Sequence, residues 1–415
     1  MTAELEQIGK QAQAAAFKLG QLATTAKNQV LQAMAQALRT EQTAILTANQ
    51  QDLLAADNLP QKFIDRLRLT SERIEQMAQG MEQVATLPDP VGTVERGWVN
   101  HAGLRIVQQH VPLGVVGIIY EARPNVTVDA AALCFKSGNA VILRGGKEAL
   151  QTNLKLGAVM RQVLADFKQP VNAIQVISDP SHETAKRLMQ LTKYLDVLIP
   201  RGSSRLIQAV VKQATVPVIE TGAGNCHVYV DESADFAMAE NIILNAKCQR
   251  PSVCNSMEKL LVHEKIAAAF LPELANKLRA AGVELRGDEK VQQLLGSTIV
   301  PATAADWDTE YNDLILAIKI VPSLTAAISH INQHSTKHSE TIVTQNYENS
   351  EHFLTAVDAA AVYVNASTRF TDGFEYGFGA EIGISTQKLH ARGPMGLPEL
   401  TTTKYLVRGN GQIRK

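Results

Sequence analysis

The fold is decided by residues 115–144, which read VVGIIYEARPNVTVDAAALCFKSGNAVILR. Two short apolar, β-branched runs at 115–120 and 140–144 enclose a segment at 126–137 whose apolar residues recur at helical spacing. A strand, a helix and a second strand of these lengths form a βαβ unit with parallel strands. Strands that are apolar on both sides must be covered on both faces, so this stretch predicts a parallel α/β sheet.

The same alternation continues beyond this stretch and then starts again. After residue 144 the expected strands are 174–177, 196–200 and 217–221, and the expected helices are 148–166, 181–193 and 203–213. A second series of strands is expected at 227–230, 259–262, 283–286, 317–321, 341–344 and 361–364. Strands that alternate with helices build doubly wound sheets, whose ligands bind beyond the carboxyl ends of the strands. The expected fold class is therefore α/β, with two doubly wound domains.

Two parts of the chain fall outside these series. The N-terminal region is rich in Ala, Gln and Leu, and its apolar spacing predicts helices within 3–40, 41–57 and 70–86. Residues 98–111 read as two strands joined by an Ala-Gly turn, and residues 400–415 hold another β-prone run. Strands without a sheet of their own usually pair with something, often a second subunit, so a ribbon that contacts another copy is expected here.

The composition narrows the class of protein. The 415 residues carry a formal net charge of -1, with 45% hydrophobic and 20% charged residues, which is typical of a globular chain. At roughly 150 residues per domain, this length predicts about two to three domains. A general nucleic-acid binder would show a basic excess, and no apolar run approaches the roughly 18 residues of a membrane span. The N-terminus carries Glu4 and lacks the basic region of a signal peptide, so a cytoplasmic protein with free thiols is expected.

The end of the 140–144 strand is basic and glycine-rich, with the sequence Arg144-Gly145-Gly146-Lys147-Glu148. A P-loop would have glycine at position 141 and Ser or Thr at position 148, where this chain has Val141 and Glu148. These differences exclude a P-loop nucleotidase. A phosphate site and a solvated turn both remain open for this segment.

A second candidate anion site follows the 196–200 strand, where Arg201-Gly202-Ser203-Ser204 leads into a helix. Ser203 or Ser204 is a good N-cap, because its side-chain oxygen can accept from the first helical N–H groups. The remaining N–H groups and the positive helix end suit a pyrophosphate. The alternative is a simple helix cap.

Cys254 has the surroundings of a nucleophile. It lies in an irregular polar segment close to Arg250, where a cation and backbone N–H groups would lower the pKa of a thiol. Cys134 lies instead in an apolar helical run and is expected in the core. Glu220 ends the 217–221 strand before a Gly-containing turn, which makes it a candidate acid or base.

Metal binding is not expected at either of two groups of potential ligands. His330, His334 and His338 recur at helical spacing, but no acidic residue nearby completes a ligand set, so a solvated helix face is predicted. The pair Cys226-His227, taken with the later cysteines, lacks the CxxC spacing of structural zinc sites.

Several of these features occur together in one known family. The order Asn125, Arg144, Gly202, Glu220 and Cys254 along the alternating elements resembles the aldehyde dehydrogenase superfamily. Longer segments are closer still to its acyl phosphate reductases of amino-acid biosynthesis, and together they cover essentially the whole chain. These segments are YEARPNVTVDAA, LIPRGSSRLI, ETGAGNCHVYVD, QRPSVCNSMEKLLVH, STKHSETIVT, NASTRFTDGFEYGFGAEIGIST and LHARGPMGLPELTT.

The resemblance implies an organisation and a set of catalytic roles. By it, the chain divides into an NADP-binding domain (1–97 and 112–225), a catalytic domain (226–390) and an oligomerisation ribbon (98–111 and 391–415). Cys254 matches the nucleophile. Asn125 matches the amide that forms an oxyanion hole with the Cys254 N–H, and Glu220 matches the base of relatives that use water. A homo-oligomer, either a dimer or a tetramer, is also implied.

The expected cofactor is NADP. Arg144 and Lys147 stand where relatives that prefer NAD often place an acid for the ribose hydroxyls, and a cationic site suits a 2′-phosphate instead. Arg123 and Arg369 are expected to bind anionic groups of the substrate. The residues expected to contact the cofactor are Arg144, Gly145, Lys147, Arg201, Gly202, Ser203, Thr221 and Gly222.

Two rival functions remain open on the sequence. An ordinary or CoA-linked aldehyde dehydrogenase would use the same fold and the same thiol, but would not need phosphate. A catalytically inactive scaffold would need none of Asn125, Glu220 and Cys254, all of which are present. The kinase that would supply an acyl phosphate is expected to be a separate protein in transient contact.

Overall fold

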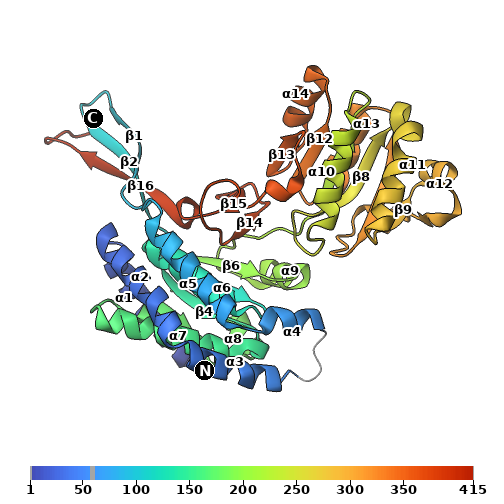
Figure 1. Cartoon of the computed structure of the whole chain (residues 1–415). Coiled ribbons are helices and arrows are strands. Elements are labelled where there is room, and N and C mark those ends of the chain that lie inside the picture. The colour runs from blue at the N-terminus through green and yellow to red at the C-terminus, as the bar shows by residue number, and fades with distance from the viewer. Residues whose placement is uncertain (1, 57–60, 415) are drawn as a thin grey trace. The chain divides into compact units, whose positions relative to one another are not determined.

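The chain folds into two compact units in this computed structural model, which describes residues 2–56 and 61–414. The first unit comprises Met1–Thr221, Gly377–Gly383 and Met395–Lys415, and the second comprises Gly222–Tyr376 and Ile384–Pro394. Both contain a parallel sheet with helices, which confirms the predicted α/β class (Figure 1). Within the described ranges, no helix has the length and apolar character needed to cross a membrane.

The first unit is built on a four-stranded parallel sheet in the order β5-β4-β3-β6. These strands are β3 (Val115–Tyr120), β4 (Ala140–Arg144), β5 (Ile174–Val176) and β6 (Val197–Arg201). All six residues of β3 are buried, and Ile118 lies opposite Leu143 on one side and Ile199 on the other. The apolar run that predicted a doubly covered strand is therefore central to this sheet.

Nine helices of the described residues belong to this unit. They are α1 (Thr2–Leu19), α2 (Thr24–Thr40), α3 (Gln42–Leu54), α4 (Gln61–Leu67), α5 (Ser71–Thr86), α6 (Pro124–Lys136), α7 (Leu150–Asp166), α8 (His182–Met189) and α9 (Ser204–Gln213). Helices α6 and α7 pack on the sheet, and α2, α3 and α5 pack on those two helices. The short helix α4 was not predicted, because its seven residues give too little periodicity to read.

The predicted strand at 217–221 is wrong in extent. Only Val218 forms a bridge, to Leu198 of β6, through the bonds Leu198 N–H to Pro217 O (2.8 Å) and Ile219 N–H to Leu198 O (3.0 Å). Pro217 has no N–H to donate, so the ladder cannot extend beyond this point in that direction. The apolar residues Val216 and Ile219 are buried all the same.

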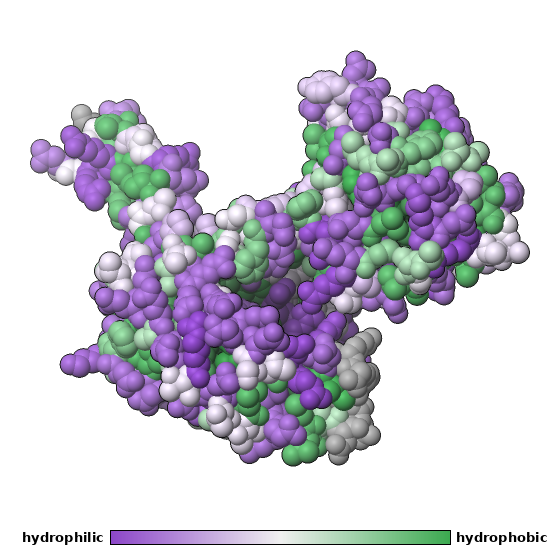
Figure 2. Space-filling view, viewed as in Figure 1, coloured by the Kyte–Doolittle hydropathy of each residue, from purple (hydrophilic) through white to green (hydrophobic). Residues whose placement is uncertain are grey.

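The strands expected at 98–111 and 400–415, outside the two α/β series, form a three-stranded antiparallel ribbon in the first unit. It consists of β1 (Val94–Val99), β2 (Arg105–Pro112) and β16 (Thr401–Arg408), in the order β1-β2-β16. This confirms the predicted strand–turn–strand, with Gly103 at φ +81 in the turn. Apolar side chains are exposed on it, and Figure 2 shows hydrophobic surface on this ribbon. The exposed apolar residues are Val94, Trp98, Val99, Tyr405 and Val407.

The second unit is built on a seven-stranded parallel sheet in the order β10-β9-β11-β8-β7-β12-β13. The strands are β7 (Cys226–Val230), β8 (Met257–His263), β9 (Glu284–Gly287), β10 (Val300–Pro301), β11 (Ile315–Val321), β12 (Ser339–Val343) and β13 (Ala361–Val364). All six predicted strands of this series are confirmed, with shifted ends. The two-residue strand β10 was not predicted.

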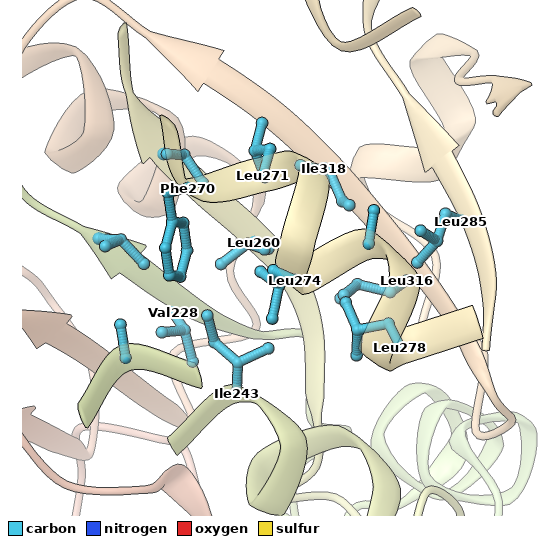
Figure 3. Packing of buried hydrophobic residues seen from close by; sticks show 14 of the residues in the cluster. Val228, Ile243, Leu260, Phe270, Leu271, Leu274, Leu278, Leu285, Leu316 and Ile318 are labelled. Atoms are coloured by element: carbon cyan, nitrogen blue, oxygen red, sulfur yellow. The ribbon is translucent and has the colours of Figure 1, made fainter. Parts of the chain in front are cut away.

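Helices cover both faces of this sheet. One face packs on α10 (Phe236–Cys248), α11 (Glu264–Ala280) and α12 (Glu289–Leu295), and Phe270, Leu271 and Leu274 of α11 lie on Leu260 and Ile318 (Figure 3). The other face packs on α13 (Leu324–His334) and α14 (Tyr347–Ala356). Two short strands, β14 (Gly383–Ser385) and β15 (Gly393–Met395), pair with each other.

Candidate active site

Cys254 lies in the turns that connect α10 to β8, where it forms no disulfide and is half-buried. Its backbone is held by two neighbours. The Cys226 Sγ donates to the Cys254 carbonyl at 3.2 Å. Gly224 approaches so closely that a Cβ on it would lie 1.3 Å from the same carbonyl oxygen. The side chain that the sequence predicts to be the nucleophile is thus presented from a fixed loop.

Asn255 ties a second segment to this loop. Its buried amide donates to the carbonyls of Arg369 (3.2 Å) and Thr371 (2.9 Å), and the Thr368 hydroxyl donates to the Asn255 carbonyl at 2.7 Å. Sequence reasoning did not single out Asn255 or Gly224. Their partners lie far away in the chain, so no local pattern could reveal them.

Arg369 is fixed beside the nucleophile loop. Its Nε donates to Gln249 Oε1 at 3.0 Å, five residues before Cys254. Burial lowers the pKa of Arg369, and nearby Arg250 lowers it further, whereas the charge of Cys254 acts in the opposite direction. A cation of this kind favours the thiolate over the thiol. Arg369, which was expected to bind substrate, therefore shares a unit and a neighbourhood with Cys254.

Asn125 lies in the first unit, in the first turn of α6 behind Pro124. It is exposed, and its Nδ2 donates to Asp129 Oδ2 at 3.1 Å. Burial raises the pKa of Asp129 to about 6, although the Asn125 amide and Arg201 act to lower it. Arg123 directly precedes this helix and is half-buried.

The segment 220–222 links the two units along the chain. Glu220 is half-buried, at the end of the extended segment beside β6. The Thr221 hydroxyl is buried and donates to the Pro200 carbonyl at 2.8 Å. The Gly222 N–H donates to Ile384 O at 2.8 Å, and a Cβ on Gly222 would lie 2.3 Å from Thr386 Cγ2. The Thr221 hydroxyl is therefore already engaged within the protein.

The two cations at the end of β4 differ in their surroundings. Arg144 is half-buried and donates to the carbonyls of Pro180 and Ser181, and burial lowers its pKa. Lys147 is exposed. A Cβ on Gly145 would lie 2.2 Å from Asn153 Nδ2, so close packing requires the glycine here. Of the two predicted cations, Lys147 is therefore the exposed one.

The start of α9 already holds an anionic group. Ser203 is confirmed as the N-cap, since its Oγ accepts from the Leu206 N–H at 3.4 Å. The Glu121 carboxylate accepts from the Ser203 N–H (3.1 Å) and from the Ser203 hydroxyl (2.6 Å). A Cβ on Gly202 would lie 2.7 Å from Glu121 Cδ. The carboxylate acts as a stand-in anion, so the residues at this helix end fit a negatively charged ligand such as a cofactor phosphate.

The prediction of a solvated histidine face on α13 is wrong. His330 is 7% exposed and His338 is fully buried. The His330 ring lies 5.3 Å from Trp307 and 5.8 Å from His227, and burial lowers the pKa of His338 to about 4. Only His330 and His334 lie on α13, which ends at His334, and His338 directly precedes β12. Among the described residues, no group of three or more His, Cys, Asp or Glu side chains could hold a metal ion.

Comparisons with known proteins agree with this architecture. The family model described as "Aldehyde dehydrogenase family" matches residues 1–308, so the chain belongs to the aldehyde dehydrogenase family. A crystal structure of an acetylating aldehyde dehydrogenase from Geobacillus thermoglucosidasius, 18% identical, has the same fold with a TM-score of 0.71 over 100% of this chain and 98% of that one.

Within that family, much closer relatives share one name. A gamma-glutamyl phosphate reductase of Ligilactobacillus salivarius is 62% identical over 100% of both chains, and that of Lactiplantibacillus plantarum is 63% identical over 99% of both. The crystal structure of the Thermotoga maritima gamma-glutamyl phosphate reductase, 48% identical, matches with a TM-score of 0.98 over 99% of this chain and 100% of that one. The chain is therefore an oxidoreductase of the gamma-glutamyl phosphate reductase group.

Proposed function

We propose that this protein reduces L-glutamyl 5-phosphate to L-glutamate 5-semialdehyde and phosphate with NADPH, as the second step of proline biosynthesis from glutamate. The names of the full-length relatives support the reaction. The observation that carries the mechanism is the Cys254 loop, where Gly224, Cys226 and Asn255 hold a half-buried cysteine beside Arg369.

The chemistry runs through a thioester on Cys254. The thiolate attacks the acyl carbon of the acyl phosphate, the bond to the phosphate oxygen breaks, and inorganic phosphate leaves. The nicotinamide cofactor, when bound, supplies hydride to the thioester carbonyl. The resulting thiohemiacetal expels the Cys254 thiolate and releases the aldehyde.

The oxyanion of each addition is assigned to the Asn125 amide and the Cys254 N–H. Preorganised donors of this kind contribute about 3–4 kcal/mol each to transition-state stabilisation. Since Asn125 and Cys254 belong to different units, their joint action is part of the proposal. Glu220 is assigned to deprotonating Cys254 rather than to activating water, because water would destroy the activated substrate.

The cofactor is assigned to the first unit, beyond the carboxyl ends of β4 and β6. Lys147 would pair with the 2′-phosphate, while the start of α9 would receive the pyrophosphate. The complete set of proposed cofactor contacts is Arg144, Gly145, Lys147, Arg201, Gly202, Ser203, Thr221 and Gly222. Arg123 and Arg369 would bind anionic groups of the substrate.

The proposal extends to domains and partners. We assign cofactor binding to residues 1–97 and 112–225, catalysis to 226–390, and oligomerisation to the ribbon at 98–111 and 391–415. The apolar side chains exposed on that ribbon support a dimer or tetramer. A cytoplasmic location and transient contact with glutamate 5-kinase complete the assignment.

Phosphate separates this function from its nearest rival. Run in reverse with glutamate 5-semialdehyde and NADP, the enzyme should require inorganic phosphate and ignore coenzyme A. Steady-state turnover that needs no phosphate would instead identify an ordinary aldehyde dehydrogenase. Turnover that requires coenzyme A would identify a CoA-linked one.

A further inference from the structure

The carboxylate of Glu121 occupies the N-terminus of α9. It accepts from the Ser203 N–H at 3.1 Å and from the Ser203 hydroxyl at 2.6 Å. It also lies against Gly202, where a Cβ would come within 2.7 Å of its Cδ. Glutamate is thus bonded to the same donors that an incoming phosphate would use.

The fold itself brings Glu121 to this position. Strands β3 and β6 are neighbours in the sheet, with Tyr120 opposite Arg201, and the Glu121 N–H donates to the Arg201 carbonyl at 3.2 Å. Glu121 directly follows β3. Helix α9 begins three residues after β6 ends, and Figure 1 shows it next to that strand. The carboxyl ends of two paired strands therefore place the acid beside the helix without help from a ligand.

The contact is favourable for the free protein. The first N–H groups of a helix have no intrahelical partner, and the positive end of the helix dipole stabilises a carboxylate. The Ser203 hydroxyl adds a charge-assisted hydrogen bond. A second anion at the same place would find these donors occupied and would face the charge of Glu121 at close range.

We propose that Glu121 is an internal competitor for the phosphates of the cofactor, and that it sets how tightly the cofactor binds. This inference rests on the proposed cofactor site. In the free protein Glu121 is hydrogen-bonded to the N-cap Ser203 at the start of α9, and cofactor binding displaces it. Because the pyrophosphate is common to the oxidised and reduced cofactor, Glu121 weakens both by the same factor.

The test is the affinity of Glu121→Gln for NADPH and for NADP, measured by calorimetry without substrate. Glutamine keeps the shape of the side chain but removes the charge. Relief of the competing contact should tighten both dissociation constants by about three- to tenfold, the range expected for a charged group at a helix end. Unchanged or weaker binding of either cofactor would overturn the proposal.

Two further variants make the result specific. Glu72→Gln removes an exposed carboxylate from the first turn of α5, so it should bind both cofactors as the wild type does. Glu121→Asp keeps the charge but withdraws it by one methylene, and it should tighten binding less than Glu121→Gln. If Glu121→Gln does not fold, the absence of any tightening in Glu121→Asp overturns the proposal. A wild type that binds neither cofactor would refute the proposed cofactor site itself.

Discussion

Replacing Gly224 with alanine should displace the nucleophile loop. A Cβ at this position would lie 1.3 Å from the carbonyl oxygen of Cys254, 2.2 Å from its carbonyl carbon and 2.6 Å from its Cα. All three atoms are backbone, so no side chain can rotate away. Ordinary contact begins near 3.4 Å, and the two segments would therefore have to separate by about 2 Å.

The size of the effect follows from this displacement. A misplacement of about 1 Å can cost on the order of 100-fold in rate when reacting groups must be aligned. We therefore expect kcat of Gly224→Ala to fall by at least about 100-fold. Overpacking of this kind also costs about 1–3 kcal/mol of folding stability. Cofactor affinity should not change, because the proposed cofactor residues other than Gly222 belong to the first unit.

The assay combines kcat, the dissociation constant of NADPH and the rate at which iodoacetamide alkylates Cys254. Gly80→Ala is the matched control, because Gly80 lies inside α5 and no atom stands within 4 Å of a Cβ there. That variant should keep wild-type activity and gain roughly 0.5–1 kcal/mol of stability. A wild-type kcat in Gly224→Ala would refute the claim that this close approach positions the nucleophile.

Three further predictions test separate parts of the account. Cys254→Ala should abolish turnover and keep NADPH binding, whereas Cys248→Ala, at the end of α10, should stay active. Equal activity of the two variants would exclude Cys254 as the nucleophile. Lys147→Glu should lower the preference for NADP over NAD, measured as the ratio of kcat/KM values, by about tenfold or more, because it puts an acid beside the 2′-phosphate. An unchanged ratio would exclude Lys147 as the partner of the 2′-phosphate. Asp129→Asn should flatten the pH dependence of Tm. The pKa of Asp129 in the folded protein, about 6, lies above the usual 3.8, so the wild type loses stability as pH rises from about 4 to 6. The variant should lack this loss. A variant whose Tm follows the wild-type pH profile would contradict that pKa.

The sequence predicted those features that depend on local pattern. The apolar runs at 115–120 and 140–144 correspond to buried strands, because a strand covered on both faces has nothing but apolar neighbours. The cap at Ser203 was predictable for the same reason, since its bond spans only three residues. The motif order around Asn125 and Cys254 also led to the correct family.

What the sequence did not reveal depends on contacts across the fold. The segment 217–221 looked like a strand, but Pro217 limits its pairing to a single bridge. His330 and His338 looked solvated because nothing nearby in sequence pairs with them, and only the folded structure shows that both are buried. Arg144 donates to carbonyls at least 36 residues away, which no local motif encodes.

Glu121 lies between these two cases. Its bonds to Ser203 span 82 residues, so no local pattern contains them. Its place directly after a predicted strand was nevertheless visible, as was the place of Gly202 directly after another. The carboxyl ends of adjacent parallel strands meet at one edge of a sheet. The order of the strands, which the sequence alone did not supply, was the missing information.

The central claim is that an acyl group is carried on Cys254 and released by phosphate. The most direct test mixes the enzyme with glutamate 5-semialdehyde and NADP in the absence of phosphate and follows NADPH in the first turnover. The account predicts a burst of at most one NADPH per subunit, a Cys254 that bears the mass of a glutamyl group, and full turnover when phosphate is added. Linear turnover without phosphate, or an unmodified Cys254 after the burst, would contradict it.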